Sequence, residues 1–290
     1  MPYQKKSQGK FFFIQRIFVA FLAICGFTVL PVAAEPPDAD TIVRKMKEVF
    51  EPEHPSVRKF VIAVKGVNGA ETAWVAVKAQ KTLADGKRSL LVMLEPEDAK
   101  GKALLVGETV NQPDSMWVYL PTVRRVRRIA PLESHMSFFD TDFTYADLGF
   151  IDRYGSYVFR GEEELNGVKT YKISKVSEER EYYSRIFTWV AADSMLPLKR
   201  EYYDLEGKLW KVETFEKIAV VEEVATPFLV HMEDVRTGSS SEFRVSEAHY
   251  NVTLPDDLFD PANLPTVADS DVWRNLGFST VAMTQATETK

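Results

Sequence analysis

The sequence predicts a mostly β protein: one large antiparallel sheet, curved into a half-open barrel, with a few covering helices. From Ser56 onward, short runs rich in Val, Ile, Tyr, Phe and Trp alternate with turn sequences such as Asn166-Gly167, which is typical of hairpins. Within runs such as 227–235, apolar and polar residues alternate, so one face of the sheet is apolar. Helix-forming sequence is too scarce to fill that face, which favours a partly open barrel with a lid.

Residues 1–34 have the features of a secretory signal. Basic residues up to Arg16 precede an apolar stretch at 17–30, and small residues follow at Val32 and Ala34. The apolar run is shorter than the ~20 residues that span a bilayer, so we expect cleavage after Ala34 rather than a retained anchor. Cys25 follows Ile24, whereas lipidated cysteines follow a small residue, so we do not expect lipidation.

Cleavage also bears on compartment and charge. It removes the single cysteine, and a chain of this size without disulfides fits the periplasm of a Gram-negative bacterium. The net charge of −6 falls to about −10 when the basic signal is removed. An acidic chain of this kind is not expected to bind nucleic acid.

The elements follow in order. A helix is predicted at 38–50, with Asp38 and Asp40 as capping candidates and Pro52 and Pro55 beyond its end. Short helical pieces are expected around 138–149 and after Pro255. Strands are predicted at 57–67, 71–80, 88–95, 102–110, 115–120, 123–130, 156–161, 168–176, 183–191, 196–204, 208–218, 226–236 and 241–250.

One predicted hairpin, residues 117–129 with the sequence WVYLPTVRRVRRI, is strongly basic in an acidic protein. Strand alternation divides its arginines between the two faces, so a regular strand does not build a single basic patch. We call this stretch the basic hairpin, and its arginines are Arg124, Arg125, Arg127 and Arg128.

An aromatic segment with acidic residues follows the basic hairpin. We expect Asp142 and Asp147 to accept bidentate bonds from the arginines and so to hold residues 131–150 over the sheet as a lid. In the alternative, one or two arginines lie at the mouth of a cavity and meet a lipid headgroup phosphate or a partner protein.

Three stretches together resemble a known family. They are MWVYLPTVRRVRRI with the following DFTYADL (residues 142–148), TWVAADSMLPLKREYYDLEGKLWK (188–211) and LPDDLFDPANL (254–264). The sequence resembles the outer-membrane lipoprotein-sorting proteins, the group related to the periplasmic carrier LolA. The resemblance implies a half-barrel of antiparallel strands wrapped around helices and enclosing an apolar cavity for acyl chains.

The resemblance also implies a domain organisation and a function. We expect a single carrier domain at 35–264 and a C-terminal tail at 265–290. The carrier is expected to be a monomer that shuttles a lipoprotein or a lipid between the inner and outer membranes, with transient membrane contact. An inner-membrane transporter of the resistance-nodulation-division type is the expected partner. The alternative is an envelope adaptor that docks on a transporter through the basic hairpin.

Candidate site residues fall into two groups. Aromatic residues that could line the ligand cavity, or simply pack in the core, are Trp117, Tyr119, Phe187, Trp189, Tyr202 and Trp210. Candidates for a gate, a headgroup contact or a latch are Arg124, Arg125, Arg127, Arg128, Asp142 and Asp147.

Enzymatic and metal chemistry have no sequence signal. The four histidines have no metal-ligand spacing, and HExxH, GxSxG and P-loop motifs are missing from the sequence. An envelope hydrolase would need a convergent pair of acids in a cleft, and the sequence does not mark one. We therefore expect no enzyme activity, no metal and no cofactor.

Overall fold

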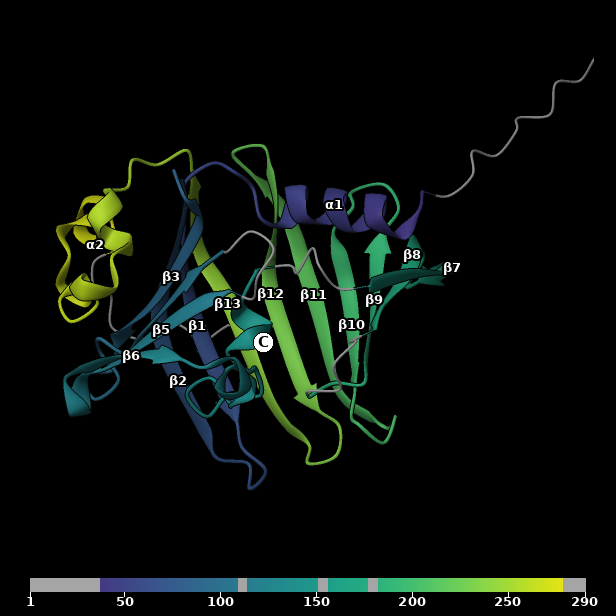
Figure 1. The fold of residues 1–290 in the computed structure, drawn as a ribbon, viewed down its shortest axis with the longest axis horizontal. Coiled ribbons are helices and arrows are strands. Elements are labelled where there is room, and N and C mark those ends of the chain that lie inside the picture. Colours follow the sequence, from purple (N-terminus) through teal and green to yellow (C-terminus); the bar gives the residue numbers. More distant parts are fainter. Residues whose placement is uncertain (1–36, 109–113, 151–155, 177–181, 279–290) are drawn as a thin grey trace, which may run out of the picture. The chain divides into compact units, whose positions relative to one another are not determined.

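The sheet dominates the protein. The computed structural model describes residues 37–108, 114–150, 156–176 and 182–278. Within them thirteen strands form one sheet in the order β6-β5-β4-β3-β2-β1-β13-β12-β11-β10-β9-β8-β7 (Figure 1). Neighbouring strands are antiparallel, and β6 and β7 at the two ends do not pair with each other. The predicted class, a large antiparallel sheet in a half-open barrel, is confirmed.

The bounds of the strands agree with the sequence pattern to within a few residues. The strands are β1 (Ser56–Lys65), β2 (Glu71–Leu83), β3 (Gly86–Glu95), β4 (Ala103–Gly107), β5 (Ser115–Leu120), β6 (Arg125–Ile129), β7 (Ser156–Leu165), β8 (Val168–Val176), β9 (Arg185–Ala191), β10 (Pro197–Tyr203), β11 (Leu209–Val221), β12 (Val224–Asp234) and β13 (Ser239–Tyr250). Turn chemistry explains the agreement. At the β7–β8 turn, for example, Asn166 and Gly167 both have positive φ, as a two-residue hairpin turn with the strands' twist requires.

The first and last strands meet in the middle of the sheet. β1 pairs with β13, so that Val57 lies opposite His249 and Ile62 opposite Phe243. This pairing joins two meanders, β1–β6 and β7–β13, into one sheet.

The two faces of the sheet bury different clusters. We call inner the face that carries Phe60, Leu91, Met232 and Phe243, which belong to the largest buried cluster. The opposite, outer face buries a second cluster along β2–β5, with residues such as Leu105.

The outer face of β2–β5 is covered by the C-terminal segment. This segment contains the 3-10 turns η4 (Asp256–Phe259), η5 (Pro261–Asn263) and η6 (Val267–Asp269) and the helix α2 (Asp271–Asn275), which lies beside β3 in Figure 1. Trp273 and Phe278 are buried there, and the indole Nε1 of Trp273 donates to the Val267 carbonyl at 2.7 Å. Part of the stretch that we assigned to a C-terminal tail therefore packs on the sheet.

The helix α1 (Ala39–Phe50) covers the inner side of β8 and β9. The Asp38 carboxylate accepts the Thr41 amide at 2.8 Å and caps the helix. Ile42 and Met46 are buried against Ile173 of β8 and, on β9, against Val190. The predicted helix is confirmed.

Residues 131–150, which we call the cover segment, connect β6 toward β7. The segment contains the 3-10 turns η2 (Pro131–His135) and η3 (Ala146–Leu148), and an isolated bridge joins Ser137 to Thr144. Of the helical piece predicted around 138–149, only η3 forms. The turn between the bridge partners instead uses positive φ at Phe139 and Asp140. Among the described residues, no helix has the length and apolarity required to cross a bilayer.

Candidate functional site

The cover segment places aromatic side chains on the inner face. Phe138 and Phe143 are fully buried, and the Phe143 ring meets Phe243 of β13 edge to face, with centroids 4.9 Å apart. Tyr145 meets Phe138 in the same geometry at 5.7 Å. The segment therefore fills part of the hollow side of the sheet with its own side chains.

Asp142 ties the segment to the end of β13. Its carboxylate accepts the Ser239 and Ser241 hydroxyls, each at 2.6 Å, and its backbone amide donates to the Ser241 Oγ at 2.8 Å. Lys211 Nζ donates to the Asp142 carbonyl at 2.5 Å. These bonds hold a surface loop on the sheet at a point far away in the sequence.

Asp147 and Phe150 anchor the second half of the segment. The Asp147 carboxylate accepts the Thr144 amide at 2.8 Å and the Tyr183 hydroxyl at 3.2 Å. The Phe150 amide donates to the Asp114 carboxylate at 2.8 Å. Burial raises the pKa of Asp114 to about 6, although this hydrogen bond opposes the shift.

A cavity of about 90 Å³ lies between the cover segment and the inner face. Its apolar lining includes Phe60, Leu91, Phe143, Phe150 and Phe243. For comparison, an engineered apolar cavity of about 150 Å³ in another protein holds one benzene molecule, so the space here is too small for a long acyl chain in this conformation. Larger ligands require the cover segment to move.

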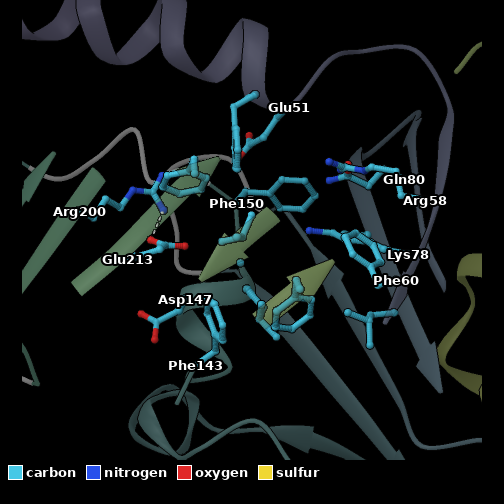
Figure 2. Close-up of a pocket in the computed structure, with 18 residues that line it drawn as sticks. Glu51, Arg58, Phe60, Lys78, Gln80, Phe143, Asp147, Phe150, Arg200 and Glu213 are labelled. Atoms are coloured by element: carbon cyan, nitrogen blue, oxygen red, sulfur yellow. Dashed lines mark hydrogen bonds and ion pairs between the residues drawn. The ribbon is translucent and has the colours of Figure 1, made fainter. Parts of the chain in front are cut away.

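The same cavity is lined by charged groups at two places. In Figure 2, Phe150 lies between Arg200 and Glu213 on one side and the pair of Arg58 and Gln80 on the other. Glu51, Lys78 and Asp147 are the other charged residues labelled there. The cavity is therefore amphipathic rather than purely apolar.

Arg200 and Glu213 neutralise each other. An Arg200 guanidinium nitrogen lies 3.2 Å from the Glu213 carboxylate, which also accepts the Tyr202 hydroxyl at 2.7 Å. Burial raises the pKa of Glu213, and the Arg200 charge opposes the shift. Glu51 is likewise engaged, because the Lys47 ammonium lies 3.4 Å from its carboxylate.

Arg58 and Lys78 have no such acidic partner among the described residues. Arg58 donates to the Gln80 side-chain oxygen at 2.6 Å, and its buried Nε has no acceptor. Burial lowers the pKa of Lys78 to about 8, and the neighbouring Arg58 charge adds to the shift while Glu51 opposes it.

The six aromatic candidates are not among the residues that line this cavity. Trp117 and Tyr119 belong to the outer-face cluster. Phe187 and Trp189 also point to the outer face, where the Trp189 ring lies under the Lys172 ammonium at 4.5 Å. That these four residues, and Tyr202 and Trp210, contact a ligand therefore stays a prediction.

Tyr202 and Trp210 lie closer to the cavity. Tyr202 is buried on the inner face, and its hydroxyl bonds a cavity-lining carboxylate. Trp210 packs against the same cluster, donates to Asp234 at 2.6 Å and carries Arg236 over its ring at 3.9 Å.

The arginine–aspartate latch is corrected by the structure. Arg127 pairs with Glu133 of the cover segment at 2.7 Å, and Asp142 and Asp147 are bound by the hydroxyl and amide groups given above. Arg128 lies 5.9 Å from the Trp117 ring centre. The four arginines of the basic hairpin are all exposed, and Arg124 has the left-handed conformation, with φ of 48°. Water solvates exposed guanidinium groups well, so nothing forces these arginines onto the aspartates.

The charged residues of the cavity were not predicted from the sequence, although the alternation in β2 indicates one of them. In the run WVAVKAQ of β2, Lys78 and Gln80 follow Trp74 and Ala76 at intervals of two and so share the apolar inner face. A cation in phase with core residues is the pattern that marks such a position. Among the described residues no group of His, Cys, Asp and Glu side chains has an arrangement that could hold a metal ion.

The sequence was compared with family models and with curated proteins. A family model described as an uncharacterized protein matches residues 85–266. A comparison with curated proteins gives no match.

Three solved structures are similar over most of the chain. A putative outer membrane lipoprotein-sorting protein domain from Vibrio parahaemolyticus has a TM-score of 0.73 at 23% identity, over 78% of this chain and 98% of that chain. A DUF1329 family protein from Desulfovibrio piger has a TM-score of 0.72 at 28% identity, over 78% and 97%. A LolA superfamily protein from Nitrosomonas europaea has a TM-score of 0.62 at 21% identity, over 77% and 98%. The predicted resemblance is confirmed at the level of the fold.

Proposed function

The chain belongs to the family of uncharacterized proteins whose model matches residues 85–266, and since it has the LolA-like fold we propose that it is a periplasmic carrier of acyl chains. It binds the chains of a lipoprotein or a lipid on the inner face of its sheet and carries them between the inner and outer membranes. Residues 1–34 act as the cleaved secretory signal. The carrier domain begins at residue 35 and, beyond the predicted end at 264, includes the C-terminal segment that packs on the sheet up to Phe278. An inner-membrane transporter loads or unloads the cargo.

The observation that carries this proposal is the cover segment. Phe138 and Phe143 are buried in the inner-face cluster in the place of a ligand, and Phe143 contacts Phe243. Besides these apolar contacts, the segment is held by hydrogen bonds that the Asp142 and Asp147 carboxylates accept from Ser239, Ser241 and Tyr183, and it adds no strand to the sheet. Polar tethers of this kind exchange readily with water, so the segment is suited to leave the apolar face when acyl chains arrive.

Energetics favour such an exchange. Each buried methylene contributes about 0.8 kcal/mol, so a chain of a dozen carbons offsets the loss of two phenylalanine contacts. Release then needs a partner or a membrane that returns the cover segment to its place.

The test is to purify the protein from periplasm and from membrane extracts and to examine it by native mass spectrometry. We expect bound lipid, and after delipidation we expect uptake of a fluorescent fatty acid in a saturable manner. Protein that is always empty and takes up no probe contradicts the proposal.

A second candidate function, an adaptor that docks through the basic hairpin, is favoured by one observation. Exposed apolar residues stand next to the exposed arginines in the sequence: Val123 is 62% exposed, Leu132 76% and Met136 57%. Basic and apolar groups together suit an anionic membrane or a transporter surface. In a carrier the same surface is the place of transient membrane contact.

A further inference from the structure

Two cations of the cavity oppose each other across neighbouring strands. Arg58 of β1 and Lys78 of β2 are direct register partners on the inner face (Figure 2). Like charges at directly opposite positions repel, and burial makes each charge more costly. The pair is therefore expected to destabilise the sheet unless an anion binds between the two cations.

The protein neutralises the pair only in part, because the Glu51 carboxylate favours the charged form of both cations but forms no ion pair with either of them in the part of the chain that the structure describes. Arg58 is bonded to the neutral Gln80, and its buried Nε lacks an acceptor. Lys78 makes no hydrogen bond or ion pair with any residue that the structure describes.

The acids that line the cavity each have another partner at closer range. Glu213 is held by Arg200 and Tyr202. Glu51 lies beside the Lys47 ammonium, and Asp147 accepts bonds from within the cover segment and from Tyr183. Donor groups of the two cations thus line the cavity without an acidic partner in direct contact among the described residues.

The surroundings of the pair are apolar. Phe60 follows Arg58 on the same face of β1, and Leu91 of β3 lies opposite Lys78. Phe143 and Phe243 close the cavity. A ligand that satisfies this site needs an anion for the cations and an apolar body for the rings.

We propose that Arg58 and Lys78 bind the carboxylate or phosphate group of an acyl-chain amphiphile, whose chain replaces the phenylalanines of the cover segment on the inner face. The inference rests on the proposed carrier function and narrows its cargo to molecules with an anionic headgroup. The guanidinium and the ammonium supply charge-assisted hydrogen bonds that the protein leaves unused.

Binding of an anionic ligand at this site should change the protonation of Lys78. The pKa of Lys78, lowered to about 8, rises again when an anion sits beside the ammonium. At pH 8 the binding of an anionic amphiphile is therefore accompanied by uptake of a proton, and the binding of a neutral one is not.

The experiment compares dodecanoate with dodecanol, which share a chain and differ in charge. Affinities of the delipidated full-length mature protein are measured by isothermal titration calorimetry at pH 8, in two buffers of different ionisation enthalpy. The variants are Lys78→Met and Arg58→Met, and Lys78→Gln replaces the first if it fails to fold. Lys65→Met, at the exposed end of β1, is the matched control.

We expect the wild type and Lys65→Met to prefer dodecanoate with proton uptake. In the site variants the ratio of the two affinities falls by about tenfold or more, because a hydrogen bond to a charged group contributes that much. Proton uptake disappears in Lys78→Met, while binding of dodecanol is retained in all proteins.

Three outcomes overturn the inference, and they differ from each other. If both ligands bind and the ratio is the same in every variant, the carrier stands and the headgroup site does not. If inorganic phosphate or acetate displaces dodecanoate at equal concentration, the cations bind a free anion rather than an amphiphile. If the wild type binds neither dodecanoate nor dodecanol, the carrier function itself fails.

Discussion

Phe143 of the cover segment packs edge to face on Phe243 of the last strand, with ring centroids 4.9 Å apart and ring planes at 86°. Phe143 is 2% exposed and also lines the cavity. One side chain thus contributes both to the stability of the closed form and to the exclusion of ligand. Removing it should separate these two roles.

We expect Phe143→Ala to lower the free energy of unfolding by about 3 to 4 kcal/mol, the usual cost of truncating a buried phenylalanine. It should also speed the uptake of a fluorescent fatty acid, because the cover segment loses its main apolar contact. Denaturant titration and stopped-flow fluorescence measure the two effects. Phe259→Ala, equally buried on the outer face, controls for stability alone. Equal acceleration in both variants would refute a specific role of Phe143.

Locking the cover segment should prevent binding. Asp142 and Ser241 are in side-chain contact at 2.6 Å, so the double variant Asp142→Cys with Ser241→Cys brings two thiols together. Under oxidising conditions we expect uptake of the fluorescent fatty acid to be lost, and a reductant should restore it. Each single cysteine variant serves as control and should be insensitive to redox conditions. Unchanged uptake in the oxidised double variant means that ligand enters without movement of this segment.

Asp114 should make stability depend on pH. Its pKa is about 6 in the folded protein and near 3.9 in an unfolded chain, so between these values the folded state binds more protons. The free energy of unfolding therefore falls as the pH rises from about 4 to 6. Asp114→Asn removes this loss, and at pH 7.5 it should be more stable than the wild type by about 1 to 2 kcal/mol, allowing for partial exposure.

Urea titrations at several pH values test this prediction. Asp140→Asn, at an exposed position of the cover segment, controls for the loss of one carboxylate. Parallel curves for wild type and Asp114→Asn would show that Asp114 does not titrate in that range.

The buried ion pair should respond differently from the unpaired cations. Arg200→Met leaves the Glu213 carboxylate buried with only the Tyr202 hydroxyl as partner, so we expect a loss of about 3 kcal/mol in the free energy of unfolding. The double variant with Glu213→Gln should recover most of it. Lys78→Met, in contrast, should be neutral or stabilising, because it removes a half-buried charge that forms no ion pair with any described residue. Thermal and urea unfolding distinguish the three variants.

Charge reversal in the basic hairpin should weaken binding to anionic membranes without changing the binding of acyl chains. Arg125→Glu with Arg127→Glu should reduce binding to anionic vesicles by at least about tenfold, since each basic residue near such a surface contributes ~1 kcal/mol. Fatty-acid uptake should not change. Lys65→Glu with Lys208→Glu, at other exposed sites, is the control of equal charge. Vesicle co-sedimentation that is equal for both pairs would leave the hairpin without a special role.

The fold was predictable because alternation and turn residues act locally. In β12, Phe228, Val230 and Met232 all belong to the inner-face cluster or pack against it, as the pattern indicates. The helix at the start follows equally from its cap at Asp38 and the spacing of its buried residues.

The choice of face was not predictable for β2–β5. There the sheet is buried on both sides, because residues such as Trp273 of the C-terminal segment cover the outer face. Trp117 and Tyr119 therefore look as suitable for a cavity as the inner residues Met116 and Val118. The two faces can be distinguished only in the structure, where the C-terminal segment is seen to cover the outer one.

The partners of the acidic residues were hidden for a different reason. Asp142 is bound by Ser239 and Ser241, nearly a hundred positions later in the chain, and serine carries no charge that could mark it as a partner. The arginines nearby in sequence were the more visible choice, yet they are solvated or, as in Arg127, paired with Glu133.

The central pairing of β1 with β13 has a consequence for biosynthesis. Until residues 239–250 have been synthesised, β1 and β12 each have an unpaired strand edge. The two halves of the sheet cannot join before then. Pairing so distant in sequence is slow to form, so the joining of the two meanders is expected to be the late step of folding. A chain cut between Asp234 and Ser239 leaves two half-sheets with bare edges in place of one continuous sheet.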